Sequence, residues 1–444
     1  MIRSFRLSAI LLTVLALSPS LQAQTPRGYY KDVFMDSGIL LTSRRDLPTA
    51  RSLGYSMEMF VSAHPKYGEP LTGLDTLLQT QVICGSTLDE NGVLLYPDNA
   101  PRFRVVYMNG GKAVNHAKTL TEVGRNNYRT FIENGGSYVG TCAGAFIACK
   151  ATAKPTADSA KLSAVYMGLW PGCTTGTGLS NSETDMSIPK KSPLLKYYDF
   201  GGNLNVEGVR HNGGCYANQV FMWPEKTEIL AYYQTYNRQL KRDINGKPSI
   251  WSIKDNDYTG RVISCGSHPE GNVEGENFYL MKAMLQYAMD GNGAPRVKAA
   301  LAKGEPRIMD KWTHDNQPDF ARLGDKQYHH FTYEVPKNCD SLVISLEAVN
   351  GWNKFDLYLY ANPGDFAFAD NAWYRNVDLG VSKTLTIRKP KAGKLFISVF
   401  CDTTVETEMT FYGERYKGRT DVLNGVPYII TVDPQPKKEE APAK

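Results

Sequence analysis

One short segment of the chain combines a cysteine with the small residues that a catalytic turn requires. Cys142 stands in the run Gly-Thr-Cys-Ala-Gly-Ala at 140–145, where a short apolar strand is expected to pass directly into a helix. A nucleophile at such a turn needs small neighbours because the backbone is strained there. The helix N-terminus favours a thiolate, and the backbone N–H of Ala143 would face a substrate as an oxyanion donor. A buried structural cysteine at a tight turn is the alternative interpretation.

A second segment carries a histidine and a carboxylate at short spacing. His268 and Glu270 flank Pro269 in the sequence Ser-His-Pro-Glu, which follows a predicted strand at 260–265. A carboxylate two residues away can accept a proton from one imidazole nitrogen and so fix the tautomer and orientation of the ring. Because histidines beside prolines are also common in ordinary loops, it is the combination with Cys142 that points to nucleophilic catalysis.

The elements around these residues predict a parallel sheet. An apolar run at 103–108 reads as a strand that ends in a glycine loop, and the stretch 119–134 has helical spacing closed by two glycines. A short strand at 137–140 and the helix after Cys142 complete a βαβα unit. Later strands at 228–233 and 260–265 and an apolar helix at 277–289 end this α/β domain, 24–295. Parallel strands would bring both motifs to the carboxyl edge of the sheet, where α/β enzymes place their sites.

Composition and the N-terminal segment limit the classes of function. The 444 residues are enough for two or three domains, and 42% apolar with 21% charged residues excludes wholesale disorder. A net charge of +5 is too weak to argue for nucleic acid or an anionic membrane surface as partner. Residues 1–23 have the basic start, apolar stretch and terminal small residue of a signal peptide. We therefore expect export to a periplasm or the extracellular space and no stable membrane insertion; an uncleaved N-terminal anchor is the alternative.

The eight cysteines contain no C-x-x-C pair, so a zinc ribbon or redox dithiol has no support. Export permits disulfides, and Cys339 with Cys401 is the expected bridge because no other cysteine lies in the C-terminal third. A pair between Cys149 and Cys173 is a second candidate. The histidines outside the two motifs lack metal-ligand spacing with carboxylates, so we predict no metal and no cofactor.

The C-terminal third has a different pattern of apolar and polar residues. After a basic, helix-prone connector at 296–320, apolar and polar residues alternate in short runs between turns over 321–433, which predicts an all-β sandwich. Its aromatic residues could contact carbohydrate or peptide if they are exposed, and core packing is the alternative. Residues 434–444 read as a disordered tail.

With these motifs together, the segment 100–290 resembles the class I glutamine amidotransferase-like superfamily, and within it the branch that is similar to biotin-protein ligase N-terminal domains. The resemblance implies a flavodoxin-like parallel sheet with flanking helices and a triad formed by Cys142, His268 and Glu270. It also implies that Gly111 supplies the other oxyanion N–H. The loops at the predicted strand ends give further candidate pocket residues, which are Asn109, Gly110, His211, Asn212 and Tyr216. The domain at 321–433 resembles bacterial pre-peptidase C-terminal domains.

These observations favour an exported cysteine-dependent hydrolase that acts on an amide or peptide-like bond of a small-molecule or peptide substrate. No synthetase domain accompanies the triad, and the glutamine-pocket residues of the superfamily cannot be assigned, so glutamine is not carried over as substrate. Two alternatives remain open. One is a non-catalytic binding protein on an amidotransferase-like scaffold, and the other is a glutaminase or amidotransferase with a separate partner.

Overall fold

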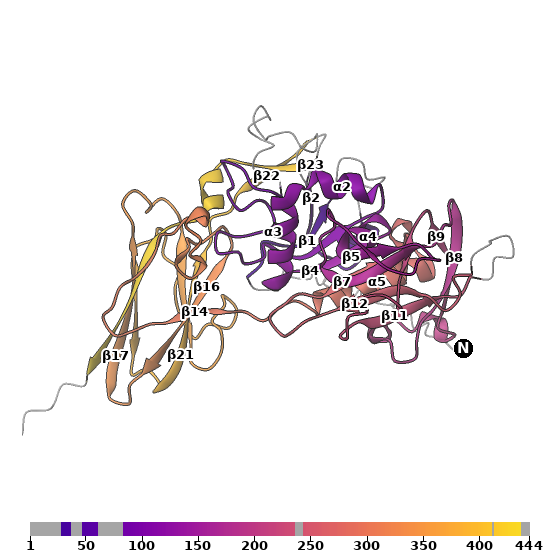
Figure 1. Ribbon diagram of the computed structural model, residues 1–444. Helices are drawn as coiled ribbons and strands as arrows, with labels where there is room; N and C mark the ends of the chain where they lie inside the picture. Colours follow the sequence, from indigo (N-terminus) through magenta and orange to yellow (C-terminus); the bar gives the residue numbers. More distant parts are fainter. Residues whose placement is uncertain (1–27, 37–46, 61–82, 236–242, 411–412, 437–444) are drawn as a thin grey trace, which may run out of the picture.

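The computed structural model describes residues 28–36, 47–60, 83–235, 243–410 and 413–436. The predicted signal peptide at 1–23 lies outside these residues, as does most of the predicted tail. The described chain forms two regions side by side, an α/β region and a β-sandwich (Figure 1). In the described residues no helix is long and apolar enough to cross a membrane.

The α/β region is built on a nine-stranded mixed sheet with the order β2-β1-β3-β4-β13-β12-β11-β8-β9. The first five strands are parallel, and the other four pair antiparallel. The sheet is therefore more extensive and less parallel than the expected flavodoxin-like one. The main-sheet strands are β1 (Lys31–Asp36), β2 (Met57–Phe60), β3 (Phe103–Met108), β4 (Ser137–Thr141), β8 (Ser182–Ser187), β9 (Asn205–His211), β11 (Glu228–Tyr233), β12 (Pro248–Ile253) and β13 (Val262–Cys265).

A second, four-stranded sheet and the α-helices α1 to α5 complete the described part of this region. The order of the small sheet is β10-β7-β5-β6. One apolar side of α5 packs on the main sheet, because most of its large residues are buried. The remaining elements are β5 (Cys149–Ala153), β6 (Lys161–Leu162), β7 (Trp170–Gly176), β10 (Cys215–Ala217), α1 (Pro48–Ser52), α2 (Ala113–Thr119), α3 (Thr121–Glu133), α4 (Ala143–Ala148) and α5 (Gly275–Met289).

The sandwich consists of two packed sheets with the orders β14-β16-β21-β18-β19 and β15-β24-β17-β20. Alternate residues of its strands are buried, as in β20, where every second side chain points inward. The strands are β14 (Val297–Ala300), β15 (Arg307–Met309), β16 (Tyr328–Val335), β17 (Cys339–Ala348), β18 (Leu357–Asn362), β19 (Tyr374–Asn376), β20 (Lys383–Arg388), β21 (Gly393–Cys401) and β24 (Tyr428–Pro436).

The stretch 296–320, expected to be a helix-prone connector, instead supplies an edge strand to each sheet of the sandwich. β14 pairs with β16, and β15 pairs with β24. Helix propensity summed over a short basic segment is weak, and backbone pairing with an open sheet edge overrides it.

The predicted disulfides are absent, and all eight cysteines, each in the described part of the chain, are free thiols. Cys339 lies on β17 and Cys401 on β21, in opposite sheets of the sandwich. Cys149 and Cys173 lie on neighbouring strands, but the Cys149 thiol contacts the hydroxyl of Thr174 at 3.2 Å instead. Being the only two cysteines in a region does not make them neighbours, since a bridge requires close and correctly directed Cβ atoms.

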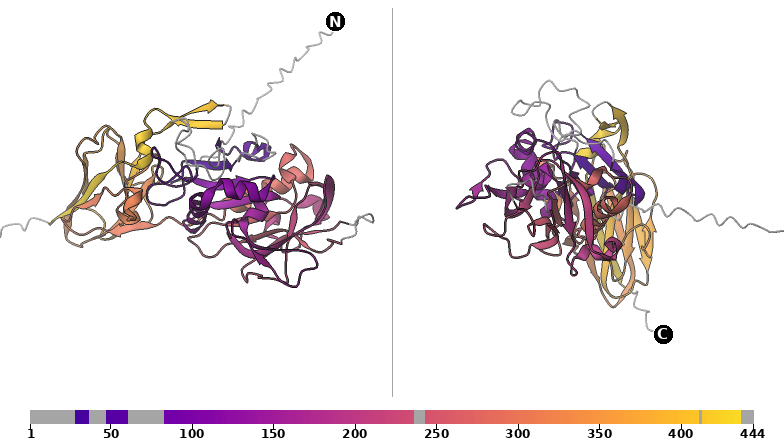
Figure 2. Two further views of the ribbon diagram at one scale, coloured as in Figure 1. Left: turned by 45° about the horizontal axis from the view of Figure 1, so that its top comes forward. Right: turned by 90° about the vertical axis from the view of Figure 1, so that its right-hand side faces the viewer.

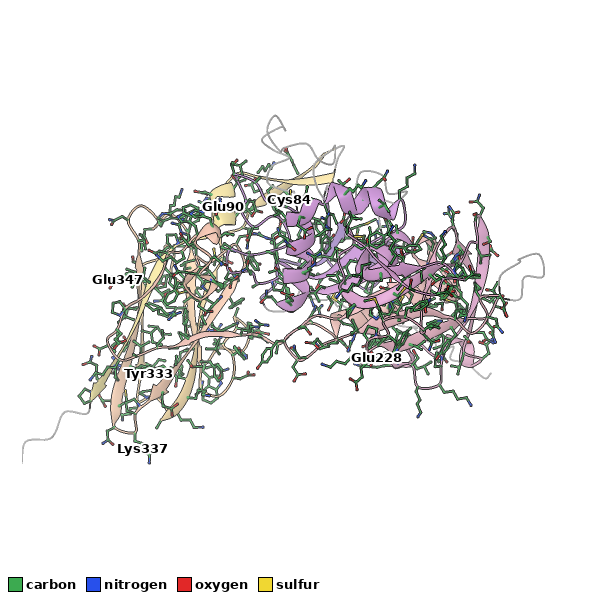
Figure 3. All side chains as sticks on the ribbon, viewed as in Figure 1. Cys84, Glu90, Glu228, Tyr333, Lys337 and Glu347 are labelled. Carbon is green, nitrogen blue, oxygen red and sulfur yellow. The ribbon has the colours of Figure 1, made fainter. Side chains whose placement is uncertain are left out.

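The two regions share a continuous apolar cluster and a set of buried polar contacts. Arg102, just before β3, forms an ion pair with Asp325, and neither side chain is exposed. A hairpin formed by β22 (Glu406–Thr410) and β23 (Gly413–Lys417) extends from the sandwich over the α/β region and contacts β2 (Figure 2). Figure 3 shows Glu90 at this junction, where its backbone N–H donates to the Asn424 side chain at 3.0 Å.

Candidate active site

Cys142 occupies a strained turn between β4 and α4. Its backbone has φ of 47° and ψ of −100°, a combination that few residues other than glycine adopt. The backbone N–H of Cys142 donates to the carbonyl of Cys265 at 2.9 Å, which ties the turn to the neighbouring strand. A Cβ atom on Gly144 would collide with the carbonyl of Met108, so only glycine lets the helix approach β3 this closely. The turn is thus held in place by the sheet.

The parallel pairing of β4 with β13 brings the second motif to the same edge. Thr141 lies opposite Cys265 in the register, so the residues that follow both strands leave the sheet together. His268 follows β13, and its Nδ1 lies 2.9 Å from Glu270 Oε1. The two side chains are 14% and 16% exposed, so the pair is accessible from outside.

The electrostatics of His268 favour the imidazolium form. Burial by itself lowers the pKa of His268, but hydrogen bonds to Cys142 and Glu270 and the charge of Glu270 outweigh it and raise the pKa to about 10. Because Nδ1 faces Glu270, Nε2 is the ring nitrogen left for the Cys142 thiol. An imidazolium beside a thiol is the arrangement in which a cysteine nucleophile is most readily ionised.

The glycine loop after β3 closes the other side of the histidine. A Cβ atom on Gly110 would collide with Cε1 of His268, so the backbone packs directly against the imidazole ring. Gly111 has φ of 151°, in the region that favours glycine. Within the described chain, the backbone N–H groups of Gly111 and Ala143 have no protein acceptor, which leaves both for a ligand.

His211, predicted to line the pocket, is instead a buried structural residue with hydrogen bonds at both ring nitrogens. It is fully buried, with Nε2 at 2.7 Å from the hydroxyl of Thr177 and Nδ1 at 2.8 Å from that of Ser267. Burial and the nearby positive charge of His268 lower its pKa to about 4, so the ring is neutral. Since both nitrogens are occupied, His211 positions the residue before His268 and offers no free group to a substrate.

The other predicted pocket residues lie around the same edge in different environments. The carbonyl of Asn212 accepts from the Cys142 thiol at 3.6 Å, which places this loop against the cysteine. Asn109 is buried, and its side-chain oxygen has no partner in the described part of the chain. Tyr216 lies half-buried on β10, packed against the core of the α/β region.

Two tyrosines that support the turn carry no obvious signal in the sequence. The hydroxyl of Tyr107 lies 3.1 Å from that of Thr141, beside Cys142, and the hydroxyl of Tyr138 donates to the carbonyl of Gly144 at 2.9 Å. Burial and the charge of Glu270 raise the pKa of Tyr107 well above its usual range, so it stays protonated. Aromatic residues in a buried strand ordinarily indicate packing, so only their position next to the cysteine turn could have identified them.

No group of three or more His, Cys, Asp and Glu side chains among the described residues is arranged to hold a metal ion. The polar groups at this edge are instead the Cys142 thiol, the His268 imidazole next to it and the Glu270 carboxyl next to the imidazole. Two backbone N–H donors lie beside them. Such an arrangement can attack an acyl carbon and protonate a leaving group.

Residues 99–303 match the family model described as biotin-protein ligase, N terminal. The matched segment contains the cysteine turn, the glycine loop and the His268–Glu270 pair. An uncharacterized protein of Chlamydia muridarum is 25% identical over 201 residues, which cover 44% of this chain and 72% of that protein.

Two solved structures also align with the chain. A putative ThuA-like protein from Bacteroides uniformis is 13% identical, with a TM-score of 0.32 over 61% of this chain and 97% of that one. The pre-peptidase C-terminal domain of a collagenase from Bacillus anthracis is 11% identical, with a TM-score of 0.18 over 32% of this chain and all of that one.

Proposed function

We propose that this protein is a cysteine-dependent hydrolase of an amide or peptide-like bond, with Cys142, His268 and Glu270 as its triad. The observation that carries the proposal is the position of Cys142 on a strained strand-to-helix turn with the His268–Glu270 pair beside it. A buried structural cysteine needs neither the strained backbone nor a histidine oriented by a carboxylate.

In the first half of the reaction, the Cys142 thiolate attacks the acyl carbon, and the carbonyl oxygen becomes an oxyanion. The free N–H groups of Gly111 and Ala143 are the donors that would stabilise it. The imidazolium of His268 then gives its Nε2 proton to the leaving nitrogen as the C–N bond breaks. The products of this half are an amine and a thioester on Cys142.

In the second half, His268, now neutral, accepts a proton from a water molecule as the water oxygen attacks the thioester carbon. The C–S bond breaks, a carboxylic acid leaves, and Cys142 with His268 returns to the ionised pair. Glu270 keeps the imidazole ring oriented through both halves by its contact with Nδ1.

The α/β region is proposed to be a member of the class I glutamine amidotransferase-like superfamily. Its support is the parallel half of the main sheet, with the cysteine turn after β4 and the histidine after β13. Export to the periplasm or the extracellular space is part of the proposal and rests on the composition of residues 1–23. The sandwich would then be an accessory domain.

Brief labelling with a limiting amount of iodoacetamide, followed by mass spectrometry of the intact protein and its peptides, tests the proposal. Cys84 is a suitable internal reference, because it is a free thiol and more exposed than the buried Cys142. We expect Cys142 to be alkylated faster than Cys84 despite its burial. The variant His268→Ala should slow alkylation of Cys142 by roughly 100-fold, the usual scale for a proton-transfer partner, and leave Cys84 unchanged.

A non-catalytic binding protein is the second candidate, and the burial of the nucleophile favours it. Cys142 is only 5% exposed, and its thiol is directed to the carbonyl of Asn212. If Cys142 reacts no faster than Cys84, or if His268→Ala has no effect, the hydrolase proposal is wrong and binding is the better account. If alkylation is selective for Cys142, the next experiment is to screen amide and peptide libraries for hydrolysis. The variant Cys142→Ala is the inactive control.

A further inference from the structure

Asp36 and His116 form a buried pair at the carboxyl edge of the main sheet, outside the proposed triad. Asp36 is the last residue of β1, and His116 lies in the middle of α2. The Nε2 atom of His116 lies 3.1 Å from Oδ2 of Asp36, and neither side chain is exposed. The hydroxyl of Tyr128, on α3, donates to the same oxygen at 2.5 Å. One carboxylate oxygen therefore connects a strand to two helices.

Both of these contacts are donated to the carboxylate. Burial and the charge of Asp36 raise the pKa of Tyr128 well above its usual range, so the hydroxyl keeps its proton. A carboxylate only accepts hydrogen bonds, so Nε2 of His116 carries the proton in the contact with Asp36. The other ring nitrogen, Nδ1, is buried and has no hydrogen-bond partner among the described residues. The bond to Asp36 is therefore what fixes the orientation of the His116 ring.

The pair joins the two ends of the loop that follows β3. Residues 109–112 connect β3 to α2 and contain the glycine proposed as an oxyanion donor. At the start of this loop, Met108 lies opposite Asp36 in the parallel register of β3 and β1. At its end, the backbone N–H of His116 donates to the carbonyl of Lys112 at 3.0 Å. The bond between Asp36 and His116 thus ties the first turn of α2 to the strand next to β3.

The loop has few groups of its own that could fix its shape. Gly110 and Gly111 have no side chains, and the side-chain oxygen of Asn109 has no partner in the part of the chain that the structure describes. The φ of Gly111 is 151°, in the region that favours glycine. Because glycine has more conformational freedom than any other residue, the direction of this N–H has to be fixed by contacts outside the loop.

A buried polar pair is not what packing alone would favour at this position. Apolar side chains of similar volume are often equally stable or more stable, because the cost of desolvating polar groups offsets their attraction. A hydrogen bond between two buried groups does, however, require one relative orientation of its partners. Asp36 and His116 are therefore better suited to determining a conformation than to adding stability.

We propose that Asp36 and His116 are positioning residues that hold the N–H of Gly111 in the direction of the oxyanion. The inference rests on the proposed function, because an oxyanion forms only if Cys142 attacks an acyl carbon. Neither residue contacts the substrate, since both side chains are fully buried. They act through the ends of the loop, by keeping α2 at a fixed position relative to β1 and β3.

The second proposed donor, the N–H of Ala143, is supported by a different contact. The hydroxyl of Tyr138 donates to the carbonyl of Gly144 at 2.9 Å, in the first turn of α4. This bond does not involve His116. Loss of the His116 contact should therefore displace the donor on Gly111 and leave the donor on Ala143 in place.

Two reagents with different transition states separate the oxyanion donors from the nucleophile. The thiolate attacks iodoacetamide at a saturated carbon and iodide leaves, so no oxyanion forms. It attacks p-nitrophenyl acetate at the carbonyl carbon, which passes through a tetrahedral oxyanion. The C–O bond then breaks, p-nitrophenolate leaves, and Cys142 carries an acetyl thioester. Mass spectrometry of the whole protein after brief exposure gives both rates, and the ratio of acylation to alkylation reports the donors.

The variant His116→Phe keeps a ring at this position but loses the bond to Asp36. Removal of one oxyanion donor typically lowers a rate by about 100- to 1,000-fold, so displacement of one should lower acylation by roughly tenfold or more. Alkylation should stay at the native rate. His116→Gln has an amide N–H at about the distance of Nε2 from the backbone, and it should restore acylation.

The matched control is His330→Phe in the sandwich. His330 is also buried, and its Nδ1 lies 2.7 Å from the hydroxyl of Ser398. Its replacement should change neither rate. If circular dichroism shows that His116→Phe does not fold, Asp36→Asn takes its place, because the amide has the same size and its nitrogen cannot accept a hydrogen bond. We expect the same fall in the ratio of acylation to alkylation.

Failure of this inference and failure of the proposed function give different results. If native Cys142 is not alkylated selectively, the hydrolase proposal is wrong and the inference falls with it. If native Cys142 is alkylated selectively but is not acylated, or if the ratio is the same in the native protein and in the folded variants, the pair does not position an oxyanion donor. A parallel fall of both rates would show that the pair supports only the fold of the site, and it would also overturn the inference.

Discussion

The carboxyl edge of the main sheet and the junction with the sandwich both contain buried or half-buried ionisable groups, but they use them differently. At the edge, the pKa of His268 is raised by a thiol and a carboxylate, and two backbone donors have no acceptor among the described residues. At the junction, Arg102 faces Asp325, and Lys298 faces Asp98. The first arrangement keeps groups available for a reaction, whereas the second neutralises charge to hold two regions together.

The largest effect is expected from breaking the junction. Asp325→Ala leaves Arg102 buried without its partner, and the loss of a buried counterion typically costs about 3–5 kcal/mol. Urea unfolding followed by circular dichroism measures this. The control is Asp421→Ala, which removes the partner of Lys354 in an exposed pair and should change stability little. If both variants unfold at the same urea concentration, the Arg102–Asp325 pair does not stabilise the junction.

A smaller effect, on reactivity and not on stability, is expected from displacing the imidazole at the edge. Gly110→Ala introduces a methyl group where Cε1 of His268 now lies, so the ring must shift from its present position beside Cys142. A displacement of about 1 Å can reduce a catalysed rate by roughly 100-fold, and the alkylation rate of Cys142 should fall by up to that amount. Gly271→Ala has open space around the added atom and serves as the control. Equal alkylation rates in the two variants would contradict the proposed contact.

A third prediction concerns the charge state of His268. The substitution Glu270→Gln removes the negative charge next to Nδ1 but keeps a hydrogen-bonding group of the same size. The pKa of His268, raised to about 10 in the native protein, should fall toward its ordinary value of 6.5. Histidine side-chain NMR spectra recorded across the pH range measure this directly, and alkylation of Cys142 at neutral pH should slow by roughly tenfold. A native His268 that titrates near pH 6.5 would contradict the model of an ionised pair.

The smallest effect is a change in how stability depends on pH. Because the pKa of His268 is higher in the folded than in the unfolded chain, its contribution is complete below pH 6.5 and is lost as the pH rises to about 10. In Glu270→Gln this loss should be smaller. Urea unfolding of both proteins across this range tests the sign, and a native protein that becomes relatively more stable than Glu270→Gln as pH rises would contradict it.

The strongest sequence signals concern the edge of the sheet. The strands at 103–108 and 228–233 have the predicted bounds, since continuous apolar runs are reliable signs of buried strands. β8 and β12 were not predicted, because β8 is polar and β12 begins with Pro248, and only pairing with neighbouring strands explains them. Parallel pairing of the strands before Cys142 and His268, which the sequence predicts, is enough to place Cys142, His268 and Glu270 at one edge of the sheet.

Residues whose environment depends on distant contacts were harder to predict. His211 lies beside a glycine turn like a pocket residue, but the hydroxyls of Thr177 and Ser267 occupy both its nitrogens. The predicted disulfide between Cys339 and Cys401 was wrong, because the two cysteines lie in different sheets of the sandwich. The order of residues along the chain does not reveal which sheet each strand joins.

The hairpin β22–β23 and the pairs at the junction also bear on how the protein is made. Arg102 is synthesised more than two hundred residues before its partner Asp325, and the hairpin that contacts β2 comes later still. Until Asp325 has been translated, Arg102 therefore lacks the carboxylate with which it forms its ion pair in the folded protein. We expect this region to complete its folding only after the sandwich has emerged, so the order of translation makes the two regions one folding unit.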